Sequence, residues 1–106
     1  MSLAKKRGEQ EVNVSPPDTI GSGGKTVSVA GTAETLASTQ ECRFVIIYAK
    51  AGNTGNVFYG GSNVSSTVGG VLEQARDSGW FQVDNLSKIY IDAANSSDGV
   101  SYVFVV

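Results

Sequence analysis

Histidine is absent from this 106-residue sequence, which also has one cysteine, two prolines and one tryptophan. Without histidine the chain lacks the commonest acid–base catalyst and the commonest metal ligand of proteins. The single cysteine, Cys42, excludes an intramolecular disulfide and a thiolate metal cluster. Because Cys42 directly precedes the most apolar run of the chain, we expect a buried and inert side chain rather than a reactive thiol.

Long hydrophobic runs and an excess of positive charge are also missing. No apolar stretch approaches the roughly 20 residues that a membrane span needs. The basic start at Lys5, Lys6 and Arg7 is not followed by the apolar core of a signal peptide. The net charge is −2, whereas a duplex-binding domain needs a basic surface to neutralise phosphates. We therefore predict a soluble protein made in a reducing cytoplasm, with neither a membrane nor nucleic acid as its partner.

What the sequence does contain is a series of short apolar segments separated by turns rich in glycine, asparagine and serine. Such segments, bounded by turn residues, predict strands. Six to eight strands without helices between them predict an all-β protein, a compact antiparallel β-sandwich that is jelly-roll-like or barrel-like. One stretch, 73–78, has helix-favouring residues but room for a single turn only. The predicted strands are 25–30, 33–36, 43–51, 56–59, 71–72, 80–83, 88–93 and 100–106.

The segment 43–51 gives the strongest strand pattern. Its apolar residues lie on both faces, with Phe44, Ile46 and Tyr48 on one and Val45, Ile47 and Ala49 on the other. Two apolar faces predict a central strand that is covered on both sides, so Ile46→Ala is expected to cost about 2–5 kcal/mol. The turn residues 52–55 predict a hairpin between this strand and 56–59.

Residues 1–24 differ in composition from the rest. Apolar residues are sparse, both prolines occur there, and the run Gly21-Ser22-Gly23-Gly24 closes the stretch. Too little apolar surface can be buried to offset the entropy of ordering, so we predict an extended arm with a Gly-rich hinge, followed by a β-sandwich domain over 25–106. The alternation at Val12 and Val14 is suited to adding a strand to a sheet edge, on this subunit or on a neighbour. The candidate contact residues of the arm are Leu3, Lys5, Lys6, Arg7, Val12 and Val14.

Two patterns resemble binding motifs and are better explained otherwise. The run 21–26 is similar to the end of a phosphate-binding loop, but Thr19 stands where a glycine is needed and a strand follows instead of a helix. Asp92, Asn95 and Asp98 carry oxygen ligands suited to calcium, but their spacing does not fit the twelve-residue calcium loop. Asn, Ser, Asp and Gly are also the residues that turns use. We therefore expect a linker and a turn, and no cofactor or metal.

Catalysis is the least favoured class of function. No Gly-x-Ser-x-Gly segment occurs, a serine nucleophile would find no histidine base, and nothing singles out a carboxylate pair among the ten acidic residues. An interface is better supported. If Phe81 and Val83 point into the core, alternation sends Trp80 outward, where a large aromatic side chain can anchor a partner. Burial of Trp80 beneath the 60–67 loop or the arm is the alternative.

Several segments together resemble small domains of tailed-bacteriophage virion proteins. They are Ala51-Gly52-Asn53-Thr54-Gly55-Asn56-Val57-Phe58-Tyr59-Gly60, Val64-Ser65-Ser66, Gly70-Val71-Leu72, the run 81–93 and the closing Gly99-Val100-Ser101-Tyr102-Val103. The resemblance covers roughly residues 26–106. The chain departs from it at 73–78, where Gln74-Ala75-Arg76-Asp77 lengthen a turn that is shorter in those domains.

The resemblance implies a β-sandwich protein that acts as a capsid decoration (cement) protein, a head fibre or a tail-associated module, with no catalytic residues. It implies a place on the virion after assembly in the host bacterial cytoplasm. Its partners would be the major capsid protein or other virion proteins and further copies of itself, for example in a trimer. The alternative is a tail or fibre module that binds a host glycan through Tyr59, Trp80 and the 60–67 loop.

Overall fold

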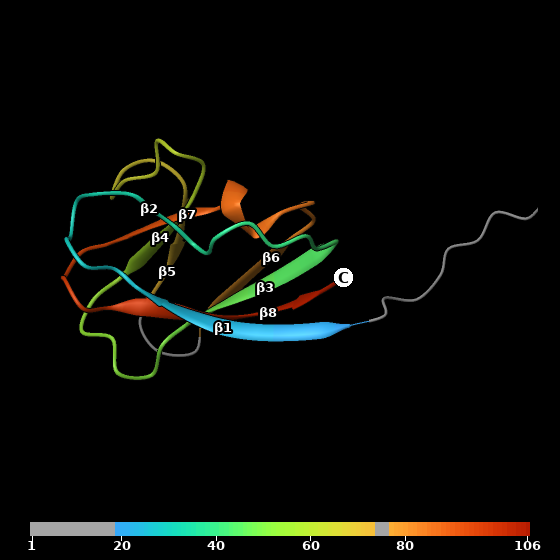
Figure 1. The fold of residues 1–106 in the computed structure, drawn as a ribbon. Helices are drawn as coiled ribbons and strands as arrows, with labels where there is room; N and C mark the ends of the chain where they lie inside the picture. The colour runs from blue at the N-terminus through green and yellow to red at the C-terminus, as the bar shows by residue number, and fades with distance from the viewer. Residues whose placement is uncertain (1–18, 74–76) are drawn as a thin grey trace, which may run out of the picture.

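Two antiparallel sheets make up the regular structure of the computed structural model, which describes residues 19–73 and 77–106 (Figure 1). The predicted all-β fold is confirmed. The strands in this part of the chain are β1 (Ile20–Thr26), β2 (Glu34–Thr35), β3 (Phe44–Ala49), β4 (Val57–Gly60), β5 (Gly70–Leu72), β6 (Ser78–Phe81), β7 (Tyr90–Ala93) and β8 (Gly99–Val105), with a short 3-10 helix, η1 (Leu86–Lys88), before β7.

The strand order identifies the sandwich as a jelly roll. One sheet has the order β1-β8-β3-β6 and the other β2-β7-β4-β5. Strand β1 pairs with β8, β2 with β7, β3 with β6 and β4 with β5. The chain is therefore one long antiparallel ribbon that wraps around the core, and of its consecutive strands only β4 and β5 pair with each other. This eight-stranded wrapping is the jelly-roll form of the predicted sandwich.

The core lies between the two sheets and is filled by alternate residues of each strand. Val45 and Ile47 of β3 are fully buried, and so is Val100 of β8, which lies opposite Ala49 of β3. Such alternation buries one face of each sheet against the other. Cys42 is also buried, as predicted, and packs in this cluster. The most deeply buried apolar side chains are Val27, Leu36, Val45, Ile47, Val57, Leu72, Leu86, Ile91 and Val100.

Strand β3 is central in its sheet but is covered on one face only. Phe44 and Ile46 are half-buried, and Tyr48 is 37% exposed. The prediction of two covered faces is therefore wrong for this strand. Two covered faces require a third layer, whereas a sandwich has two.

The predicted hairpin between 43–51 and 56–59 is also wrong, because β3 and β4 belong to different sheets. The turn between them is attached to the start of β8 instead. The backbone N–H groups of Thr54 and Gly55 each donate to the Asp98 carboxylate at 2.9 Å. Asn53 donates from Nδ2 to the Gly99 carbonyl and accepts from the Gly99 N–H at Oδ1, at 2.8 and 2.9 Å. The segment is thus a crossover between sheets.

The Gly-rich run at 21–24 is part of a strand, not a hinge, so the predicted boundary at residue 24 falls inside β1. Gly21 lies opposite Phe104 and Gly23 opposite Tyr102. A Cβ atom at either glycine would overlap the aromatic ring of its partner. The rings occupy the space that side chains of β1 would otherwise fill, which is how aromatic residues stabilise glycines in edge strands.

Two further predictions concern the positions of elements along the chain. The first strand was expected at 25–30, and it lies at Ile20–Thr26 because the glycines belong to it. The helical turn expected at 73–78 falls partly on residues 74–76, outside the described part, and β6 begins at Ser78. Within the described residues no helix is long and apolar enough to cross a membrane.

Candidate functional site

The solvent side of the sheet β1-β8-β3-β6 carries the largest group of exposed apolar side chains in the described residues. The described residues include seven exposed large hydrophobic side chains. Four of them, Ile20, Tyr48, Trp80 and Val103, belong to strands of this one sheet. The other three are dispersed over a loop, a turn and β5. We call this surface the outer apolar face; its residues are Ile20, Ser22, Gly24, Phe44, Ile46, Tyr48, Ser78, Trp80, Ser101, Val103 and Val105.

Strand register arranges these residues in rows across the sheet. The middle row runs through Ser22, Val103, Ile46 and Trp80, which are successive partners on neighbouring strands. On one side of it lies a row of large apolar residues, Ile20, Val105 and Phe44. On the other side lies a row that is small apart from one tyrosine: Gly24, Ser101, Tyr48 and Ser78. On β1 and β8 the side chains therefore become smaller along the face, from Ile20 and Val105 to Gly24 and Ser101, whereas β3 has an aromatic residue in both of these rows.

Trp80 lies on β6, the strand at one edge of this sheet. It is 67% exposed, and its ring lies 5.4 Å from that of Phe44, centroid to centroid. Of the two alternatives for this residue, outward exposure is therefore the one observed, and the 60–67 loop does not bury it. The inward neighbour Phe81 packs against the core. An exposed tryptophan on a partly buried aromatic base has the character of an interface anchor.

The outer apolar face has a charged neighbour on its own side of the sheet, Lys50, whose Cε and Nζ atoms would lie 3.7 Å from a Cβ atom at Gly24. At one end Lys50 donates from Nζ to Thr26 Oγ1 at 3.1 Å. On the opposite side of β1, Lys25 pairs with Glu34 of the other sheet at 3.0 Å, and this hydrogen bond lowers the pKa of the Glu34 carboxyl below its usual value. A contiguous apolar patch with a polar rim is typical of an interaction surface.

A second feature is an apolar hollow of about 430 Å³ where β4 and β5 of one sheet approach β6 of the other. Tyr59 and Phe81 stack in its lining, with ring centroids 5.9 Å apart and an interplanar angle of 5°. Gln82 and Lys88 add polar groups. The remaining lining includes four glycines that bracket the 60–67 loop: Gly60, Gly61, Gly69 and Gly70.

The structure thus brings together only part of the glycan site predicted from the sequence. Tyr59 and the start of the 60–67 loop meet at the hollow, but Trp80 belongs to the outer apolar face. Phe81, which the sequence predicted to be a core residue only, lines the hollow where Trp80 was expected. The alternation at 80–83 carried the signal, because it sends neighbouring aromatics to opposite faces.

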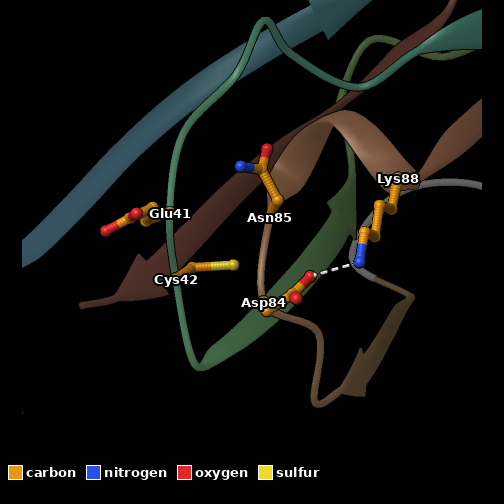
Figure 2. Close-up of a pocket in the computed structure, with 5 residues that line it drawn as sticks. All are labelled: Glu41, Cys42, Asp84, Asn85 and Lys88. Atoms are coloured by element: carbon orange, nitrogen blue, oxygen red, sulfur yellow. Dashed lines mark ion pairs between the residues drawn. The ribbon is translucent and has the colours of Figure 1, made fainter.

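A polar hollow of about 390 Å³ lies at the end of the sandwich near η1 and is lined by Glu41, Cys42, Asp84, Asn85 and Lys88 (Figure 2). The Cys42 thiol donates to the Val83 carbonyl at 3.1 Å, and burial raises its pKa, so it is not an activated nucleophile. The ion pair between Lys88 and Asp84, at 2.8 Å, lowers the pKa of Asp84, yet both groups are well exposed and stabilise the fold little.

Asn85 has a structural role in the same hollow. Its Oδ1 atom accepts hydrogen bonds from the Ser87 N–H at 3.0 Å, the Ser87 hydroxyl at 2.8 Å and the Gln40 N–H at 3.0 Å. It therefore caps η1 and fixes the segment that leads into β3. Cys42, Asn85 and the Asp84–Lys88 pair are thus all engaged in local structural contacts. Among the residues that line this hollow, no nucleophile lies beside a general base.

The buried carboxylates at 92 and 98 hold turns. Asp92 and Asp98 are 2% and 4% exposed. Asp92 Oδ1 accepts from the N–H groups of Gly31 at 2.9 Å and Ala93 at 2.7 Å, while Asp98 fixes the crossover after β3. Within residues 19–73 and 77–106 no three His, Cys, Asp or Glu residues form a group that could hold a metal ion.

Six of the predicted contact residues lie outside the described part of the chain: Leu3, Lys5, Lys6, Arg7, Val12 and Val14. Comparisons with protein-family models, with curated proteins and with solved structures each found no match to this chain. The class that the described residues define is a jelly-roll domain with an apolar face on one sheet.

Proposed function

We propose that this chain is a non-enzymatic structural protein of a tailed-phage virion, a decoration protein that attaches to the capsid surface. The observation that carries the proposal is the outer apolar face, which gives the jelly roll of the described residues a surface suited to assembly. The resemblance of residues 26–106 to domains of tailed-phage virion proteins is the reason for proposing a phage particle. Viral capsid domains also use the jelly-roll architecture.

Such a protein functions through contact area. A stable protein–protein contact buries about 800 Å² on each partner, and smaller contacts are weak alone. Lateral contacts between copies, added to an arm that binds the major capsid protein, make attachment multivalent, and the symmetry of the shell repeats it. The proposal places Trp80 in a lateral contact and the arm residues, including Val12 and Val14, in contact with the shell.

Deleting residues 1–18 is expected to leave the jelly roll folded and to weaken binding to undecorated capsids at least tenfold, about 1.4 kcal/mol. The deletion stops before β1 because the Gly-rich run pairs with β8. Co-sedimentation with purified capsids measures binding, and thermal unfolding measures the fold. If the full chain fails to co-sediment with capsids, the proposal is wrong. If the truncated chain unfolds at a much lower temperature, the arm belongs to the fold.

A second candidate function is glycan binding by a tail or fibre module, and the apolar hollow favours it. The stacked pair Tyr59–Phe81 offers a flat apolar wall, and Gln82 and Lys88 can hydrogen-bond to hydroxyl groups. If this candidate is correct, a glycan array should show binding by the full chain. Gln82→Ala should weaken that binding several-fold, while Lys50→Ala, remote from the hollow, should not. An array without any bound glycan excludes this candidate.

A further inference from the structure

We infer that a polar hollow beside Asp92 is a binding site for a primary ammonium group, that of a lysine side chain or of a small amine. The hollow measures about 530 Å³. Besides Asp92, its lining consists of alanine, glycine and serine residues at 30–31, 65–66 and 93–94. The inference goes beyond the proposed function and does not depend on it, because the hollow is separate from the outer apolar face.

Asp92 lies on the solvent side of the sheet β2-β7-β4-β5. Its neighbours on β7, Ile91 and Ala93, belong to the core, so the alternation of the strand directs Asp92 to the other side of the sheet. The connections between β1 and β2 and between β4 and β5 border the hollow there. Asp92 is only 2% exposed, so little water is available to screen the charge of its carboxylate.

The Asp92 carboxylate is bound at one oxygen only. Oδ1 accepts from the N–H groups of Gly31 at 2.9 Å and Ala93 at 2.7 Å, which occupies both lone pairs of that oxygen. Within residues 19–73 and 77–106, Oδ2 has neither a hydrogen-bond nor an ion-pair partner. By contrast, backbone N–H groups bind both oxygens of Asp98, which is also buried. A buried charged oxygen without a partner is costly, and a ligand that binds Oδ2 removes this cost.

The single free oxygen favours an ammonium group over other cations. A guanidinium group binds a carboxylate best through both oxygens, and Oδ1 of Asp92 is already occupied. Calcium takes about six to eight oxygen ligands, often from several carboxylates, whereas Asp92 is the one carboxylate that lines this hollow. An ammonium group is compact and has three N–H donors. One of them can bind Oδ2, and the hydroxyl of Ser66 in the same lining can accept another.

The small side chains around Asp92 leave room for the alkyl chain that carries the ammonium group. A Cβ atom at Gly31 would have no other atom within 4 Å, so the space beside this residue is open. An alkyl chain can pack along the alanine methyl groups of the lining while its charged end reaches Oδ2. The walls therefore suit a slender ligand with one charged end.

The backbone amides of Gly31 and Ala93 report on the site, because both donate to Asp92. In two-dimensional amide NMR spectra of the full chain at about pH 7, where a primary alkylamine is protonated, n-butylammonium should shift both signals saturably. The dissociation constant should be on the order of millimolar. Tetramethylammonium has the same charge but no N–H donor, and it should leave both signals unchanged at equal ionic strength.

A second ligand distinguishes the two sources of the ammonium group. Nα-acetyl-lysine amide carries the same group on a side chain attached to a peptide backbone. If it binds as n-butylammonium does, the hollow admits a lysine of a partner protein. If only n-butylammonium binds, the ligand is a small amine.

Two variants test the role of Oδ2. Asp92→Asn keeps an acceptor for the two backbone N–H groups but replaces Oδ2 by an NH₂ donor, so it should weaken binding at least about tenfold. Ser66→Lys, at an exposed residue of the lining, brings an ammonium group of the chain itself to the hollow. It should abolish the response to n-butylammonium, and it tests the site even if Asp92→Asn does not fold.

Ser62→Lys is the matched control, because it adds the same charge to the same loop at an exposed residue that does not line the hollow. Its binding of n-butylammonium should equal that of the wild type. The same spectra show whether each variant is folded. A wild-type chain without a saturable shift would overturn the inference, as would an equal response to tetramethylammonium or tighter binding of calcium at the same two amides. Binding that persists in folded Asp92→Asn or in Ser66→Lys, or a loss that Ser62→Lys shares, would also overturn it.

Discussion

Ile47→Ala is expected to lower the free energy of unfolding by about 2–5 kcal/mol, the range for emptying a buried isoleucine site. Ile47 has no exposed surface and lies near the middle of β3, between Gly79 on β6 and Tyr102 on β8. The deleted atoms leave a cavity that two hydrogen-bonded sheets cannot close without moving strands. Urea denaturation followed by circular dichroism measures the loss.

The adjacent residue supplies the control. Ile46 has the same side chain on the same strand but belongs to the half-buried outer apolar face, so Ile46→Ala should cost about 1 kcal/mol or less. This corrects the larger loss expected from the sequence. Equal losses at the two positions would mean that the layers are assigned wrongly.

The sequence of β3 shows what alternation can and cannot predict. The period of two placed Val45 and Ile47 on one face and Phe44 and Ile46 on the other, and the structure confirms that division. It could not say which face is inside, because both are apolar. The outer face stays apolar without a covering layer, and such a surplus of hydrophobic surface is typical of interaction surfaces.

The glycine run shows why composition misled at the N-terminal boundary. Gly21 and Gly23 have no side chain to reveal a strand, and locally they favour a flexible linker. Their strand conformation depends on Phe104 and Tyr102, roughly 80 positions further along the chain. No local pattern can report a partner at that distance.

The candidate site was predictable only in part, because its residues are also brought together by pairing between strands that are distant in the sequence. The outward direction of Trp80 followed from two inward neighbours, a local inference. Its association with Phe44, Ile46 and Val103 needed the register between β3, β6 and β8, which is set by the wrapping of the whole ribbon. The expected hairpin after β3 failed because the turn residues bind to the segment before β8 rather than to each other.

Asp98→Ala is expected to destabilise the fold by about 2–4 kcal/mol, although it removes no apolar contact of the core. The carboxylate accepts hydrogen bonds from the N–H groups of Thr54 and Gly55, each at 2.9 Å, and from the Thr54 hydroxyl. Hydrogen bonds to a charged acceptor are stronger than those between neutral groups. Their loss frees the crossover that joins β3 of one sheet to β4 of the other. Thermal and urea unfolding measure the effect.

Two substitutions separate this role of Asp98 from a general effect of charge. Asp84→Ala removes an aspartate whose ion pair with Lys88 is exposed, and it should leave stability unchanged within error. Asp98→Asn keeps the shape and one acceptor oxygen but not the charge, so its loss should lie between those of the two alanine variants. If Asp98→Ala were as stable as Asp84→Ala, the crossover would not couple the sheets. The wrapped ribbon would then be stabilised by its apolar core alone.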